Sequence, residues 1–122
     1  MKFEKVEPPR QFAVGEKRRI EMKDCGRISL DPDEQVTFLT EAGAEYDVAR
    51  KDWGFYATPS LNGRLRSFHL RAVLVKNRST GRYFVVLVEE GKEPLFERYL
   101  EDEDQVVVRW LDSSSTLDGL GS

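Results

Sequence analysis

The sequence predicts an α+β protein that is mainly antiparallel β, a sandwich or a partly open barrel, with one C-terminal amphipathic helix and a final strand. Two observations lead to this fold class. Most of the chain alternates apolar and polar residues with period two, between clusters of turn-forming residues. Residues 93–103 are the exception, because their apolar side chains recur at helical spacing.

Length and composition indicate a single domain. The chain has 122 residues, of which 39% are hydrophobic and 11% aromatic, and this is enough apolar material for one core. We therefore predict one domain over residues 1–112. Residues 113–122, which are rich in serine and glycine, are predicted to be a flexible tail.

The first half of the chain predicts short strands and one hairpin. Apolar and charged residues alternate around Ile20 and Ile28, before a turn at residues 31–33. Alternation resumes on both sides of a five-residue connection, so residues 35–50 are predicted to form a hairpin. Residues 53–57 are predicted to form a further, aromatic strand.

The strongest turn signal of the chain is Asn62-Gly63. A two-residue type I′ loop needs positive φ at both positions, which Asn-Gly tolerates best, so we predict a β-hairpin bend there. Pro59 cannot donate a ladder hydrogen bond, which places the preceding strand at an edge or a bulge. After the bend, residues 68–75 and 83–89 are predicted to form a central hairpin that is covered on both faces.

The end of the chain predicts a strand, a helix and a strand in succession. Pro94 suits the first turn of a helix over residues 93–103, in which Leu95, Phe96, Tyr99 and Leu100 share one face. Residues 106–111 are predicted to form the last strand. This order permits a right-handed crossover with the helix on one face of the sheet.

Charge is distributed unevenly along the chain. The net charge of −3 excludes a protein that is basic all over. Residues 64–82 nevertheless carry six basic and no acidic side chains, whereas residues 83–122 carry three basic and ten acidic ones. The basic middle suits an anionic partner, or else the acidic ends of the same fold neutralise it.

The sequence contains no motif typical of catalysis, metal binding or phosphate binding. His69 is the only histidine and Cys25 the only cysteine, so neither a zinc-ligand spacing nor an intramolecular disulfide is available. The carboxylate clusters lack calcium-loop spacing, and no glycine-rich phosphate loop occurs. We therefore predict no catalytic residue, no metal and no cofactor, with His69 as the best single candidate for touching a ligand.

The candidate site is a segment in which aromatic rings alternate with arginines. Rings of this kind stack on sugars or bases, and guanidinium groups fork onto carboxylates or phosphates. The predicted ligand-binding residues are Arg50, Trp53, Tyr56, Asn62, Arg64, Arg66, His69 and Arg71. The alternative is that Trp53 and Phe55 belong to the core and that the arginine stems simply cover strands.

Four segments of the sequence carry a resemblance to a known family: KDWGFYATPSLNGRL, FHLRAVLVKN, YFVVLVEEGKEPLFERYL and VVVRWLD. Through them, residues 26–112 resemble a family of small bacterial proteins encoded among genes for surface-polysaccharide and nonulosonic (sialic-acid-like) acid synthesis. The most specific part is Lys51 to Leu65. No activity is established for that family, so the resemblance transfers no catalytic residue, and glycine often stands there at the position of His69. Because such sugars carry a carboxylate and travel as nucleotide conjugates, the resemblance implies a context that suits an arginine-rich surface.

These observations predict a non-enzymatic accessory or binding protein that recognises an anionic sugar, a nucleotide sugar or a partner protein. The second hypothesis is a small sugar-modifying enzyme that uses His69, Tyr46 or Tyr56 as acid or base. Single-stranded nucleic-acid binding is the third, because the chain is acidic overall. The lone cysteine and the charged, proline-containing start predict a cytoplasmic protein without a membrane segment, as a monomer or a homodimer.

Overall fold

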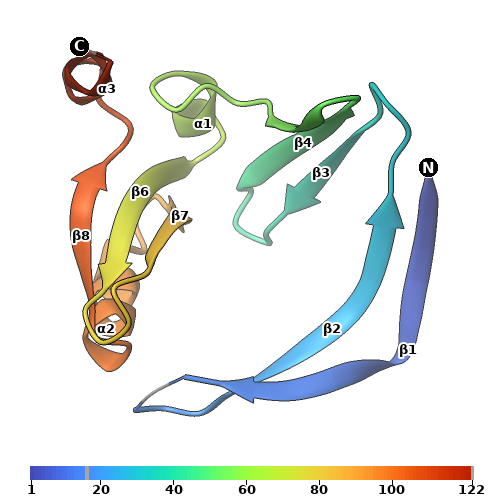
Figure 1. Cartoon of the computed structure of the whole chain (residues 1–122), viewed down its shortest axis with the longest axis horizontal. Coiled ribbons are helices and arrows are strands. Elements are labelled where there is room, and N and C mark those ends of the chain that lie inside the picture. Colours follow the sequence, from blue (N-terminus) through green and yellow to red (C-terminus); the bar gives the residue numbers. More distant parts are fainter. Residues whose placement is uncertain (16, 122) are drawn as a thin grey trace.

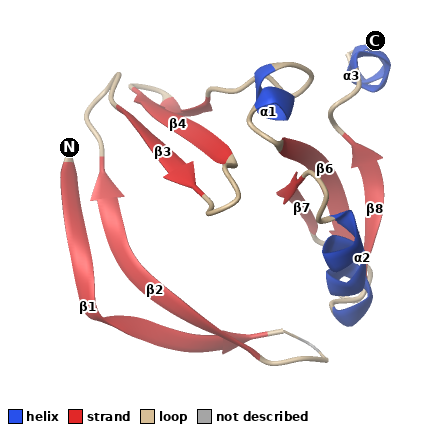
Figure 2. Ribbon diagram, turned by 180° about the vertical axis from the view of Figure 1, so that it is seen from behind, coloured by secondary structure: helices blue, strands red, loops and turns tan. Residues whose placement is uncertain are grey.

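The computed structural model describes residues 1–15 and 17–121. In chain order its elements are β1 (Lys2–Val14), β2 (Ile20–Ser29), β3 (Gln35–Leu39), β4 (Glu45–Lys51), β5 (Gly54–Ala57), α1 (Arg64–Ser67), β6 (Leu70–Asn77), β7 (Tyr83–Glu89), α2 (Glu93–Asp102), β8 (Gln105–Trp110) and α3 (Ser114–Leu120). The strands form three separate sheets with the orders β1-β2, β3-β4-β5 and β7-β6-β8, all antiparallel between neighbours (Figure 1 and Figure 2). The predicted fold class, α+β and mainly antiparallel β, is confirmed.

Strands β1 and β2 form a long two-stranded hairpin, which we call the ribbon. For most of its length the ribbon lies apart from the other two sheets (Figure 1). Its pairing runs from Lys2 opposite Ser29 to Val14 opposite Ile20, with a shift in register between Lys5 and Arg10. Pro8 and Pro9 fall in this irregular stretch, where no regular ladder donor is needed. The sequence predicts no strand over residues 2–14, because these prolines and the charged residues obscure the alternation.

The sheet β3-β4-β5 agrees with the sequence. Strands β3 and β4 pair from Gln35 opposite Ala49 to Leu39 opposite Glu45, so residues 40–44 make the predicted five-residue connection. Strand β5 then pairs along the other side of β4. It is an edge strand of this sheet.

The hairpin predicted at Asn62-Gly63 is wrong. Neither residue adopts a positive φ, and α1 begins at the next position. The hydroxyl of Ser60 accepts a hydrogen bond from the Arg64 N–H at 2.8 Å, and the Ser60 carbonyl accepts one from the Leu65 N–H at 3.0 Å. These bonds close a helical turn whose Leu65 side chain is buried, so tertiary packing outweighs the local preference for a type I′ turn.

The sheet β7-β6-β8 has the predicted strand–helix–strand crossover. Strands β7 and β8 both run antiparallel to β6, so they are parallel to each other and α2 connects them. The central strand begins at Leu70 rather than Phe68. Strand β7 was predicted to be covered on both faces, but it is an edge strand, and Tyr83, Phe84 and Val85 are exposed.

Two clusters of buried side chains cover the two faces of β6. On one face, Val73 and Val75 pack with Leu100 of α2 and with Val88 of β7. On the other face, Leu70 and Ala72 pack with Leu65 of α1 and with Ala44, next to the half-buried Tyr46 of β4. Strand β6 is therefore the centre of the molecule, and the second cluster attaches the sheet β3-β4-β5 to it.

The last residues are helical where the sequence predicted a flexible tail. Ser113 caps helix α3 by accepting a hydrogen bond from the Thr116 N–H onto its hydroxyl. None of the α3 side chains is buried, so the helix adds no residue to the core. The mobility of this segment stays a prediction. None of the helices among the described residues combines the length and the apolar composition needed to cross a bilayer.

Candidate functional site

Three aromatic side chains at the β4–β5 bend are exposed, and we call them together the aromatic surface: Trp53, Phe55 and Tyr56. Their exposed fractions are 67%, 69% and 52%. Phe55 and Tyr56 are successive residues of β5, so they lie on opposite faces of the sheet and the aromatic surface covers both sides of this edge. Trp53 lies in the turn between β4 and β5, and the other two lie on β5, which is an edge strand. The alternative in which Trp53 and Phe55 belong to the core is therefore wrong, because β5 has no layer packed over it.

Arg50 adjoins this surface. It pairs with Phe55 across the two strands, and directly opposed residues share one face of a sheet. One guanidinium nitrogen of Arg50, Nη1, donates to the carbonyl of Leu30 at 2.8 Å. The side chain is thus held beside the aromatic ring by a backbone acceptor.

Arg64 faces a carboxylate of its own chain. Its Nη2 lies 3.2 Å from Oδ2 of Asp47, a buried residue of β4. The other Asp47 oxygen accepts a hydrogen bond from Thr37 at 2.6 Å. The Arg64 guanidinium also lies 5.1 Å from the centre of the Phe68 ring. Arg64 therefore joins α1 to β4, and its charge neutralises a buried acid.

Arg66 and Arg71 converge on one acid, and we call the group they form with Asp112, Glu90 and Glu93 the Asp112 cluster. Oδ2 of Asp112 accepts a hydrogen bond from Arg71 Nε at 2.7 Å and from Arg66 Nη1 at 3.2 Å. Arg66 also contacts Glu90 at 3.2 Å, and Arg71 contacts Glu93 at 3.5 Å. Each guanidinium is thus shared between two carboxylates.

The Asp112 cluster shifts the ionisation of its members. The Asp112 side chain is only 5% exposed, and this burial raises its pKa. The hydrogen bond from Arg71 and the charges of Arg71 and Arg66 outweigh burial, so the pKa of Asp112 lies below its ordinary value. The hydrogen bond to Asp112 likewise raises the pKa of Arg71. The guanidinium of Arg71 also stacks 4.0 Å from the Trp110 ring centre.

Asn62 and His69 occupy separate positions. The Asn62 amide donates to the Ser114 hydroxyl at 3.0 Å, which links the loop before α1 to α3. His69 is exposed, has a φ of 65°, and lines a shallow hollow of about 200 Å³ with Glu89 and Glu90. Ligand pockets are usually about 300–1,000 Å³, so this hollow is small for a sugar substrate.

The structure thus brings only some of the predicted residues together. Arg66 and Arg71 meet at Asp112, whereas Arg64 pairs with an acid on β4. Arg50, Trp53 and Tyr56 lie on the sheet β3-β4-β5. Three arginines of the acid-free run are therefore paired with acids from β4, from the β7–α2 connection and the start of α2, and from beyond β8.

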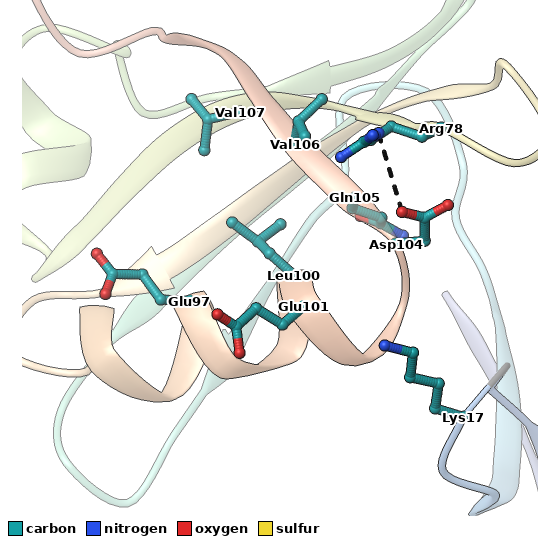
Figure 3. A pocket seen from close by; sticks show the side chains of 9 residues that line it. All are labelled: Lys17, Arg78, Glu97, Leu100, Glu101, Asp104, Gln105, Val106 and Val107. Atoms are coloured by element: carbon teal, nitrogen blue, oxygen red, sulfur yellow. Dashed lines mark ion pairs between the residues drawn. The ribbon is translucent and has the colours of Figure 1, made fainter.

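A larger hollow, of about 650 Å³, was not expected from the sequence (Figure 3). It lies between α2, β8 and the ribbon tip, and its lining residues are Lys17, Arg78, Glu97, Leu100, Glu101, Asp104, Gln105, Val106 and Val107. Arg78 lies 3.9 Å from Asp104 across its rim. The signals that could have indicated it are the basic run 17–19 and the acidic run 101–104. The two runs lie far apart in the sequence, so no local pattern relates them.

Among residues 1–15 and 17–121, no three His, Cys, Asp or Glu side chains are grouped in a way that holds a metal ion. In the Arg64–Asp47 pair and in the Asp112 cluster, the carboxylates and the cations that face them belong to the same chain. Such balanced groups hold elements together. Comparisons with protein-family models, with curated proteins and with solved structures find no significant match to this chain.

Proposed function

We propose that this chain is a non-enzymatic accessory protein that binds a partner protein through the aromatic surface formed by Trp53, Phe55 and Tyr56. The observation that carries the proposal is the exposure of these rings, 52–69%, with Phe55 and Tyr56 on the two faces of the edge strand β5, Trp53 in the turn before it, and Arg50 opposite Phe55. Exposed aromatic side chains with an adjacent arginine are the composition of protein-binding hot spots.

The geometry of the arginines favours a protein partner over an anionic sugar. Arg64, Arg66 and Arg71 already face Asp47, Glu90, Glu93 and Asp112. An anionic ligand has to displace these carboxylates, and a displaced Asp112 would be a buried, unpaired charge, which is costly. The aromatic rings need no such displacement.

The free edge of β5 supplies a backbone contribution to the same interaction. Strand β5 pairs with β4 on one side only, so an extended segment of a partner can add as a further strand on the other side. Main-chain hydrogen bonds then give affinity, and the rings give selectivity. We also propose that the protein is located in the cytoplasm of a bacterium. This proposal is based on the single cysteine, Cys25, and on the family resemblance.

Site-specific photo-crosslinking in the host cell tests the proposal. A photoreactive amino acid at Phe55 is expected to yield one discrete adduct with another protein, and Trp53→Ala is expected to abolish it. The matched control carries the photoreactive residue at Leu120, which is exposed to a similar degree on α3. Absence of an adduct at Phe55, or equal adducts at both positions, contradicts the proposal.

Titration separates the protein partner from the small-molecule alternatives. Addition of CMP- and UDP-linked acidic sugars to the isotope-labelled protein is expected to leave the amide signals of Trp53, Tyr56 and Arg64 unchanged at millimolar concentration. Saturable shifts at these residues favour the anionic-sugar hypothesis instead. Turnover of a sugar that His69→Ala abolishes favours the enzyme hypothesis.

A further inference from the structure

The half of the ribbon nearest its tip is amphipathic. Phe12 lies opposite Met22, and Val14 lies opposite Ile20, so these four side chains share one face. Gln11, Lys23 and Glu21 belong to the alternate positions and lie on the other face. The apolar face is not buried: Val14, Ile20 and Met22 are 37–43% exposed.

The tip of the ribbon lies beside the outer face of α2, but the contact is loose. Arg18 and Ile20 line a hollow of about 160 Å³ together with Leu95, Tyr99 and Asp102 of α2. Leu95 and Tyr99 are themselves exposed. A two-stranded hairpin without a packed face is marginally stable in water, so the ribbon needs more burial than this contact gives it.

The basic tip of the ribbon is complementary in charge to the acidic end of α2. Lys17, Arg18 and Arg19 are exposed at the tip, and residues 101–104 at the end of α2 are all acidic. Acidic groups at a helix C-terminus are electrostatically unfavourable unless cations approach them. The complementary surface for the ribbon therefore belongs to this chain's own sequence, and a second copy presents it as well as the first.

The accessible surface of the single chain is larger than that of a compact monomer of the same mass. The accessible surface is 8754 Å². A compact protein of this mass exposes roughly 6,700 Å², so the excess is roughly 2,000 Å². An obligate dimer interface buries about 1,000–2,500 Å² per subunit, which is the size of this excess.

We propose that two copies of this chain exchange their ribbons, so that the apolar face and basic tip of each ribbon pack on α2 and β8 of the other copy. Residues 30–32 are the hinge, because Asp33 and Glu34 already bond to the backbone of Arg50 and continue the pairing of β3 with β4. In the exchanged dimer the basic tip has the same partners on α2 as within one chain. The rest of the apolar face, which one chain leaves exposed, gains an additional contact with the other copy. The hollow of Figure 3 then lies between two subunits. This inference uses a surface other than Trp53, Phe55 and Tyr56 and does not depend on the proposed function.

Disulfide cross-linking distinguishes exchange from contact within one chain. The variant Arg18→Cys with Asp102→Cys places two thiols around the same hollow, and Cys25→Ser removes the exposed native thiol. After oxidation with copper phenanthroline, exchange gives a disulfide-linked dimer of twice the 14.1 kDa chain mass on a non-reducing denaturing gel. A cross-linked species of single chain mass overturns the proposal.

Refolding of mixed chains provides the control. Chains that carry only Arg18→Cys and chains that carry only Asp102→Cys, both with Cys25→Ser, are unfolded and refolded together. Exchange predicts a cross-linked dimer that contains one chain of each kind. Replacement of the first chain by one with Leu120→Cys, on α3, is expected to give none. Absence of the mixed dimer contradicts exchange.

Sedimentation equilibrium of the full chain tests the apolar face. At 100 µM the wild-type protein is expected to have the mass of a dimer, and a monomer at that concentration overturns the proposal. Met22→Ser is expected to raise the dimer dissociation constant at least tenfold, because each subunit loses one buried side chain. Gln11→Ser, on the opposite face, is expected to change it less than threefold. Circular dichroism establishes that both variants fold, and equal effects of the two substitutions contradict the proposed interface.

Discussion

At the scale of single residues, Asp112 is the acid on which two elements depend. It lies beyond the end of β8, and its hydrogen-bond donors come from α1 and β6. Its side chain is almost fully buried, so the two guanidinium groups supply the stabilisation that water would otherwise give. Arg71 keeps a second carboxylate, Glu93, at 3.5 Å if Asp112 is changed.

Asp112→Asn is expected to lower the free energy of unfolding by about 2 kcal/mol at neutral pH, because charge-assisted hydrogen bonds are lost. The effect is expected to depend on pH. The folded pKa of Asp112 is lowered, so its stabilisation is complete above the ordinary value near 3.8 and is lost as the pH falls through the lower folded value. Thermal unfolding of both proteins between pH 2 and pH 7 measures this.

The difference in unfolding temperature between wild type and Asp112→Asn is expected to be largest at pH 7 and to shrink below about pH 4. Glu41→Gln, a change of an exposed acid in the β3–β4 loop, is the control and is expected to show no such trend. A constant difference over the whole pH range would contradict the role assigned to the Asp112 carboxylate.

At the scale of elements, α2 is held by one row of side chains. Leu100 is buried against Val73 and Val75, and Phe96 meets Trp110 edge to face with ring centres 6.0 Å apart. The helix begins without a side-chain cap, and Pro94 occupies its first turn. Packing on β6, β7 and β8 therefore stabilises α2 more than its termini do.

Leu100→Ala is expected to lower the free energy of unfolding by about 3 kcal/mol, because it leaves a cavity between α2 and β6. Leu120→Ala, the same change on the exposed face of α3, is expected to cost less than about 0.5 kcal/mol. Urea denaturation of both variants at one low protein concentration measures the difference. Similar costs for the two variants would show that α2 does not pack as described.

At the scale of the whole molecule, the three sheets differ in how much of them is buried. Ala72, Val73 and Val75 of β6 are fully buried, whereas all of β3 except Val36 is exposed. The sheet β3-β4-β5 is attached to the rest through Ala44, Tyr46 and the Arg64–Asp47 ion pair. Because the sheets differ in burial, we expect them to open at different free energies.

Native-state hydrogen exchange is expected to resolve this difference. The amides of β6 are expected to exchange slowest, through global unfolding alone. The amides that pair β3 with β4 are expected to exchange through local opening, at a lower free energy that depends little on denaturant. Equal protection and equal denaturant dependence in β3 and β6 would contradict two levels of stability.

The elements predicted correctly are those whose signal is local. Hairpin 35–50, strand 83–89 and the helix from residue 93 follow from alternation, turn residues and helical spacing within short windows. The β-hairpin bend predicted at Asn62-Gly63 is wrong, because the burial of Leu65 and the Ser60 hydrogen bonds favour a helical turn. Strand β1 was missed because its prolines and charges hide a pairing that depends on β2.

The candidate site was predicted less well than the fold, because charge pairing is long-range. The sequence correctly singled out a basic and aromatic segment, but it did not show which acids face Arg64, Arg66 and Arg71. Their partners Asp47 and Asp112 lie 17, 46 and 41 positions away along the chain. The exposure of Trp53 and Phe55 also depends on which strand ends at the edge of the sheet.

By itself, then, the sequence determined the α+β class, the single crossover and most strand boundaries, since these follow from preferences of neighbouring residues. Only the tertiary structure decided which cations are neutralised, which aromatic rings remain in water, and that residues 2–29 form a separate amphipathic ribbon. The physical reason is that burial and ion pairing are properties of surfaces brought together by folding, and no local pattern specifies which surfaces meet.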